Sequence, residues 1–344
     1  MTRGDKACLR LALGLGLATF VAYGMALKAP FVVCVMAVLV LCKPGPPMPL
    51  LKGVVAACVL AGLVAAGVLM VPLLEHYALV GVLLTGVVLY AVFLAGQAGG
   101  GALTTLLVVA FVMIPVAGVA EQALIPLLSI TLAAGLAIGT LVNTVSHALF
   151  PDPPQASLAA TTRAAPDSPG WIALRGTIIV MPVFVLALTN PAFYLAGVMK
   201  TATLGQQAGE THAGTAGREL VGSTLMGAAI GLVVWLGLSL WASLWMLVLW
   251  LMAAALWTGA AVFGLRRTRF RPSFWSNALV TALILLGPAI EDSASGKSVI
   301  EGSIMRTCLF VGVALYASAT VWILERLRGA TAARRPPGGP RPNT

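Results

Sequence analysis

The feature that most constrains this chain is a series of long apolar runs bounded by charged residues, Pro or Gly. A helix that crosses a bilayer needs about 20 mostly apolar residues. The runs predict twelve membrane-spanning segments, at 11–28, 30–43, 52–72, 78–95, 102–119, 125–148, 172–188, 191–204, 219–239, 241–264, 276–290 and 299–324.

Composition supports this interpretation. The 344 residues are 59% hydrophobic and 9% charged, and their mean hydropathy is +0.98. A soluble chain is about 45–50% apolar and about 25% charged, so a water-soluble globular enzyme is excluded. We expect an all-α polytopic membrane protein with about 12 transmembrane helices.

The basic residues predict the orientation. With the N-terminus placed in the cytoplasm, every Lys and Arg falls on the cytoplasmic side except Lys28, Lys297 and Arg306. An excess of Lys and Arg in cytoplasmic loops is the general rule. We therefore expect a multi-pass membrane protein with both termini cytoplasmic, and we attribute the net charge of +10 to topology rather than to nucleic-acid binding.

Proline-rich segments divide the chain into four parts. Residues 151–170 contain five prolines among Ala, Ser and Thr, a composition typical of a flexible linker. We expect a first six-helix transmembrane repeat at 1–150, a flexible cytoplasmic linker at 151–170, a second six-helix repeat at 171–328 and a disordered basic cytoplasmic tail at 329–344.

The two halves share spaced residues. Gly53 and Gly62 correspond to Gly222 and Gly231 at an offset of 169 residues, and Pro115 corresponds to Pro288 at an offset of 173. Six spans per half is an even number, so the pattern predicts parallel repeats, an arrangement common in transporters. The pairs Gly135–Gly139 and Gly227–Gly231 have the GxxxG spacing typical of close helix contacts.

Motifs for enzymatic chemistry are absent from the sequence. It contains no P-loop, no GxSxG, no HExxH and no cysteine pair at metal spacing. We therefore expect no enzymatic activity, no cofactor and no metal site, and active transport would need an ion gradient or a partner.

Two short segments indicate a substrate path. The segments 30–43 and 191–204 each open with Pro and follow the first span of their half. Short segments at corresponding places of two halves point to a transport site. The second contains Lys200 and Thr201 and leads into Gln206 and Gln207, so we place Lys200 and Thr201 in the path; ordinary short spans with interfacial polar ends are the alternative.

Charged residues in the last span form a second candidate. Arg306 lies about 10 Å into the span if the helix begins near Ile300, and a charge at that depth must snorkel, pair or face water. Glu301 is five residues away, on a different face of the helix. We assign Arg306 and Glu301 to the substrate path, with a snorkelling or structural Arg306 as the alternative.

Two further sets occupy matching places in the halves. Basic residues at the cytoplasmic starts of spans could gather organic anions or simply anchor the helices; this cytoplasmic basic ring is Arg10, Lys52, Arg175 and Arg218. Prolines that remove a backbone hydrogen bond predict helix breaks at Pro30, Pro191, Pro115 and Pro288.

These residues resemble a known family. A Leu-Arg start, a Pro-led second span and a third span that begins Lys52-Gly53, or Arg218 followed by Gly222, Gly227 and Gly231, are similar to the fusaric-acid-resistance type inner-membrane proteins, the aromatic acid exporters. The resemblance implies six-helix units, efflux of aromatic or other organic anions and toxic compounds, and a periplasmic adaptor (membrane-fusion) protein as partner. Larger members carry cytoplasmic domains that this chain lacks.

The expected function is therefore efflux of a small organic anion across the lipid bilayer, driven by protons if active. Two alternatives remain open. The first is a passive anion channel of the same fold, and the second is a non-transporting scaffold of an envelope complex. Substrate identity, coupling ion and homo-oligomer formation are not fixed by the sequence.

Overall fold

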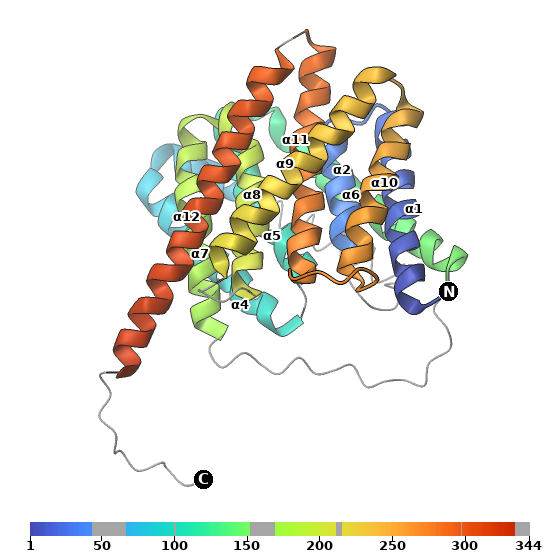
Figure 1. Cartoon of the computed structure of the whole chain (residues 1–344). Coiled ribbons are helices and arrows are strands. Elements are labelled where there is room, and N and C mark those ends of the chain that lie inside the picture. The colour runs from blue at the N-terminus through green and yellow to red at the C-terminus, as the bar shows by residue number, and fades with distance from the viewer. Residues whose placement is uncertain (43–66, 100, 152–168, 211–214, 297, 334–344) are drawn as a thin grey trace.

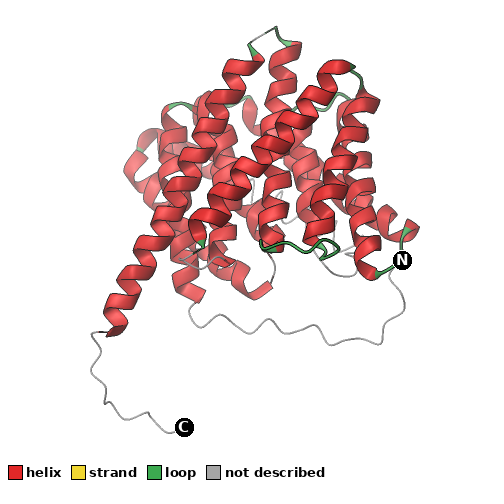
Figure 2. Ribbon diagram, viewed as in Figure 1, coloured by secondary structure: helices red, strands yellow, loops and turns green. Residues whose placement is uncertain are grey.

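The computed structural model describes residues 1–42, 67–99, 101–151, 169–210, 215–296 and 298–333. Across these ranges the chain is helical, with short connecting loops and no strand (Figure 2). The all-α prediction is confirmed for the part of the chain that is described.

The first half contains α1 (Arg3–Gly24), α2 (Pro30–Leu41), the short helix Gly67–His76, α4 (Ala78–Gly99), α5 (Gly101–Ala120) and α6 (Leu124–Leu149). The second half contains α7 (Pro169–Thr189), α8 (Pro191–Glu210), α9 (Ala216–Leu240), α10 (Leu244–Val262), α11 (Pro272–Ala294) and α12 (Val299–Ala333).

Eight of the helices described are long and apolar enough to cross a membrane: α1, α4, α6, α7, α9, α10, α11 and α12. This indicates a multi-pass membrane protein. The helices Pro30–Leu41 and Gly67–His76 are shorter. Most of the predicted segment 52–72 lies outside the described residues.

Several predicted boundaries differ from the structure. The first span, expected at 11–28, is α1 from Arg3 to Gly24. The segment expected at 191–204 continues as α8 to Glu210, so it is not short. Helix α12 continues to Ala333, past the expected start of the tail at 329, and α7 begins at Pro169, inside the expected linker. In the tail, Ala330, Ala332 and Ala333 continue the helix because Ala has the highest helix propensity. At the linker, Pro169 occupies the first position of α7, where proline is favoured.

The core lies among α2, α5, α8 and α11. Helix α2 is buried from Val32 to Val38, and α5 is buried from Val108 to Ala117. Helix α11 packs against α2, α8 and α9, and α5 packs against α8. By contrast, α4, α9, α10 and α12 expose many large apolar side chains, which suits helices that face lipid.

Glycines allow the closest helix contacts. A Cβ on Gly139 of α6 would lie 3.3 Å from Ala37 Cα of α2, and a Cβ on Gly227 of α9 would lie 2.6 Å from the Ala278 carbonyl oxygen of α11. Gly135 likewise faces α2, and Gly231 likewise faces α11. The predicted role of both GxxxG pairs in packing is confirmed.

The bundle has two distinct ends. One end, called here the N/C end, holds the start of α1, the α10–α11 connection and the last turns of α12 (lower part of Figure 1). There the Lys6 ammonium donates to the Pro151 carbonyl over 2.7 Å. The opposite end holds the α1–α2, α9–α10 and α11–α12 connections. The Arg-rich loop between α10 and α11 therefore lies at the same end as the N-terminus.

Candidate functional site

A buried lysine lies half-way along α8. Lys200 is 0% exposed, and it stands nine residues after Pro191, about 14 Å along the helix axis. Its ammonium donates to Thr281 Oγ1 of α11 over 2.6 Å. Because α8 extends to Glu210, Lys200 does not lie at a cytoplasmic helix end, and its place in the predicted cytoplasmic charge count is wrong.

Further hydrogen bonds link this contact to other polar side chains of α8, α9 and α11. Thr281 Oγ1 donates to the Asn277 carbonyl over 2.6 Å. The Asn277 side-chain amide donates to Gln207 Oε1 over 2.5 Å and to Ser223 Oγ over 2.9 Å. Gln207 Nε2 in turn donates to the Glu219 carbonyl over 3.4 Å. We call Lys200, Gln207, Glu219, Ser223, Asn277 and Thr281 the Lys200 cluster.

The Lys200 cluster ends near the Arg-rich loop. Glu219, in the first turn of α9, is 4% exposed, and its Oε1 lies 3.8 Å from Nε of Arg271, the residue that precedes α11. This contact joins the buried cluster to a partly exposed arginine at the N/C end.

Helical spacing brings these residues to one place. Lys200 and Gln207 are seven residues apart on α8, while Asn277 and Thr281 are four apart on α11, so each pair lies on one helix face. Glu219 and Ser223 are likewise four apart on α9. Gly227 allows α9 to approach the α11 backbone one turn beyond Ser223, and the polar faces of the three helices therefore meet.

The electrostatics around Lys200 favour an anion, because Glu219, the carboxylate of the cluster, lies at its far end beside Arg271. Among the residues described, no carboxylate lies within ion-pair distance of Lys200. A buried charge is normally paired, and an intramembrane ionisable residue is a functional candidate by default. The ammonium, the amides and the hydroxyls supply hydrogen-bond donors, which suit a carboxylate group.

Thr201, the second predicted residue on α8, has a local role. Its hydroxyl is buried and donates to the Gly197 carbonyl one turn earlier, over 2.6 Å. That bond satisfies the hydroxyl within its own helix, so Thr201 is not a member of the Lys200 cluster.

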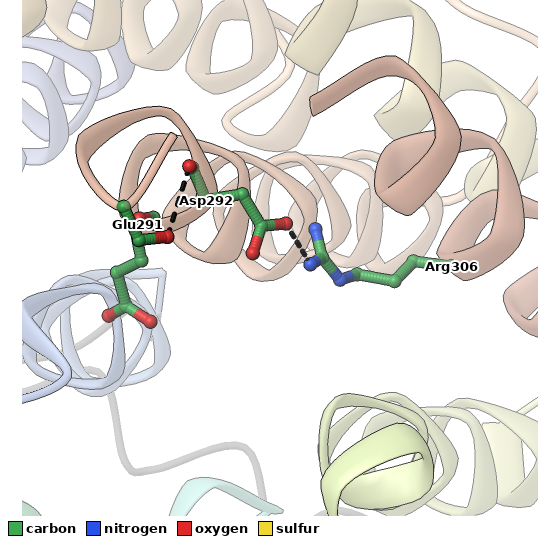
Figure 3. Close-up of polar contacts among 4 residues, drawn as sticks. Glu291, Asp292 and Arg306 are labelled. Carbon is green, nitrogen blue, oxygen red and sulfur yellow. Dashed lines mark hydrogen bonds and ion pairs between the residues drawn. The ribbon is translucent and has the colours of Figure 1, made fainter. Parts of the chain in front are cut away.

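Arg306 and Glu301 lie near the opposite end of the bundle. The Arg306 guanidinium pairs with the Asp292 carboxylate of α11, close to the α11–α12 connection (Figure 3). Figure 3 shows Glu291 pointing away from this pair, and Glu301 is exposed. Of the roles weighed for Arg306, pairing with another helix is the one observed, and Arg306 makes no contact with the Lys200 cluster.

The predicted basic ring falls into different environments. Arg175 is buried, donates to the Ala208 carbonyl of α8 and pairs with Glu325 of α12 at 3.1 Å. Arg10 is buried in α1, and Arg218 is exposed with its guanidinium 5.6 Å from the Phe270 ring centroid. Lys52 lies outside the described residues. The gathering of anions by these residues stays a prediction.

The four prolines predicted as helix breaks lie either at the start of a helix or inside one. Pro30 and Pro191 occupy the first turns of α2 and α8, where a missing backbone N–H has no cost. Pro115 and Pro288 lie inside α5 and α11. A third internal proline, Pro182 of α7, was not predicted as a break.

An apolar groove lies between α9, α11 and α12. Its volume is about 400 Å³, and Leu232, Leu286, Ile300 and Ile304 are among its lining residues. The groove contains none of the Lys200 cluster. In the described part of the chain, no group of three or more His, Cys, Asp or Glu residues is arranged to hold a metal ion.

Comparison with known proteins identifies a relationship for the first half. Residues 7–146 match a family described as "protein of unknown function (DUF2955)". The match runs from α1 into α6 and assigns no activity. No curated protein and no solved structure matches the chain.

Proposed function

We propose that this protein exports small organic, aromatic anions across a bacterial inner membrane. The observation that carries the proposal is a buried cation half-way along α8: the Lys200 ammonium donates to Thr281 of α11, and no carboxylate of the described residues lies within ion-pair distance of it. A carboxylate substrate would supply the missing counter-charge. Binding at mid-depth of the bundle is what alternating access requires.

The packing of the helices supports two parallel six-helix repeats. Helix α1 packs on α2 and α10, and its counterpart α7 packs on α8 and α4. Likewise α2 packs on α11, and its counterpart α8 packs on α5. Exchanging the halves therefore reproduces these contacts, as a two-fold axis along the membrane normal would. On this proposal all twelve predicted segments are spans.

The resemblance to the fusaric-acid-resistance type exporters supports the substrate class and suggests a periplasmic adaptor at the opposite end of the bundle. The Arg-rich loop at the N/C end supports cytoplasmic termini under the positive-inside rule. Larger members of that family carry cytoplasmic domains, whereas on this proposal the transmembrane bundle itself selects the substrate.

Counterflow of labelled benzoate in proteoliposomes, with and without a pH gradient, tests the proposal. Lys200→Met keeps the length of the side chain and removes its charge. We expect at least about tenfold slower counterflow, because a hydrogen bond to a charged group contributes about 1.5–3 kcal/mol. Lys28→Met is the matched control, since Lys28 is exposed on the α1–α2 connection, and it should transport normally.

The outcomes separate the candidate functions. Gradient-driven counterflow that needs Lys200 supports a coupled exporter, whereas flux independent of the gradient and without counterflow supports a passive anion channel. Absence of flux for every aromatic acid, in a folded protein supplied with its adaptor, would favour a scaffold. Normal transport by Lys200→Met would refute the proposed site.

A further inference from the structure

Polar residues of the Lys200 cluster lie on one side of Lys200 only. On α8, Gln207 follows Lys200 towards the N/C end; on α11, Asn277 precedes Thr281 towards the Arg-rich loop; and on α9, Glu219 and Ser223 occupy the first turns. Successive hydrogen bonds link Thr281 to Asn277, Asn277 to Gln207 and Gln207 to Glu219, each a step closer to the N/C end. They connect mid-depth of the bundle to the N/C end.

The other side of Lys200 is apolar. Helix α11 carries no polar side chain from 282 to 290, and α9 carries none from 225 to 234. Leu283, Ile284 and Leu286 of α11 are buried there, as are Val198 and Met199 of α8. Water would find no polar partner in this region, and apolar interiors of this kind stay dry.

Unsatisfied atoms on the polar side point to water. Asn277 Oδ1 and Glu219 Oε2 are buried and accept no hydrogen bond from the residues described. The Lys200 ammonium has three donors, and among the described residues one acceptor, Thr281 Oγ1, lies within reach. A buried polar atom without a partner costs about 1–3 kcal/mol, and buried water satisfies such groups with two to four hydrogen bonds of its own.

We infer that the Lys200 cluster is a hydrated access route that leads to Lys200 from the N/C end, where local opening admits the solute, and that the apolar segments of α8, α9 and α11 close it at the other end. The inference deepens the proposed function, on which it rests for the nature of the solute, and names the route by which a small anion reaches Lys200. On the proposed orientation this route opens to the cytoplasm, the side from which an exporter takes its substrate.

Labelling of single cysteines tests the route in membrane vesicles. The native Cys8, Cys34, Cys42, Cys58 and Cys308 are first replaced. Ser223→Cys is then compared with Ile230→Cys, which lies seven residues later on the same face of α9, beyond the level of Lys200. The probe is a membrane-impermeant cationic methanethiosulfonate. Cysteines at exposed Arg267 and Ser295 mark the two ends of the bundle.

We expect Ser223→Cys to react from the side that labels Arg267→Cys, at least about tenfold faster than Ile230→Cys, which would need local opening to react. Reaction from the Ser295→Cys side, or equal rates for the two cysteines, would overturn the inference. Asn277→Cys and Ile284→Cys, also seven residues apart, repeat the comparison on α11 if the first pair fails to fold.

The labelling does not depend on transport. If the route is labelled as expected but benzoate and related acids are not transported, the proposed function fails and the access route stands. If transport requires Lys200 but Ser223→Cys is not accessible from the N/C side, the route fails and the proposed function stands.

Discussion

Replacing Lys200 with Met is expected to stabilise the protein while slowing transport. Lys200 is fully buried, and its one acceptor within reach in the described part of the chain is the neutral Thr281 hydroxyl. Burying an ion in a protein costs several kcal/mol even when water reaches it, and one neutral hydrogen bond does not offset this. Met fills nearly the same volume without a charge. Thr281 keeps its own bond to the Asn277 carbonyl, so Lys200→Met leaves no new unsatisfied donor.

The expected gain in the free energy of unfolding is about 1–4 kcal/mol, the range found when buried charges are replaced by apolar residues of similar volume. Thr281→Val has the opposite sign, because it removes the acceptor and leaves the ammonium buried without a partner. Losing a hydrogen bond to a charged group costs about 1.5–3 kcal/mol. In Lys200→Met, where that bond no longer exists, Thr281→Val should cost much less.

The wild type, the two single variants and the double variant form a double-mutant cycle. Thermal unfolding of each purified protein in detergent, followed by tryptophan fluorescence at one scan rate, measures their stabilities. The eight tryptophans provide the signal. Lys200→Met should melt later than the wild type, and the two substitutions should not be additive. A loss of stability in Lys200→Met greater than about 1 kcal/mol would refute the reasoning, because it would show that the ammonium is a net stabilising donor.

Further predictions concern packing and ion pairs, and unfolding in detergent measures each one. Arg306→Ala and Asp292→Ala each remove half of a mostly buried pair; we expect losses of about 1–3 kcal/mol that are not additive in the double variant. Gly227→Ala places a Cβ 2.6 Å from the Ala278 carbonyl and should cost about 1–3 kcal/mol. Gly312→Ala, with no atom within 4 Å, should be neutral or stabilise by up to about 1 kcal/mol; equal effects at the two glycines would contradict the packing argument. Glu325→Gln weakens the partly exposed pair with Arg175 and should cost at most about 1 kcal/mol; a much larger loss would mean that α12 is held to α7 mainly by this contact.

The sequence was sufficient to predict the helices and their order. Apolar runs give strong signals because lipid excludes alternatives to the helix, and α4 to α7 and α9 to α11 lie at the predicted places to within a few residues. Helix ends were less accurate where polar residues continue a helix. Lys200 and the glutamines after it were interpreted as the end of a short span, whereas α8 continues to Glu210.

The candidate site was predicted in part. Lys200 was selected from the sequence, but its partners on α9 and α11 were not. Ser223 and Glu219 were interpreted as part of a Gly-rich segment that begins with a basic residue, and Asn277 lies close to the Arg-rich loop, where a polar residue needs no explanation. Their spacing of four residues along a helix was the available signal. Which helix faces meet is decided by tertiary packing, and a single sequence does not contain that information.

The proposed repeat allows Lys200 to be compared with its counterpart in the first half. With Pro30 aligned to Pro191, Lys200 corresponds to Leu39 of α2, and with Pro115 aligned to Pro288, Thr281 corresponds to the buried Val108 of α5. The first half therefore has an apolar pair where the second half has an ammonium and its acceptor. Since Val108 lies in the apolar core and Leu39 packs against that core, a polar pair is not needed for packing at this place. A residue that costs stability, and whose counterpart in the other half is apolar, is best explained by a function that only one half performs.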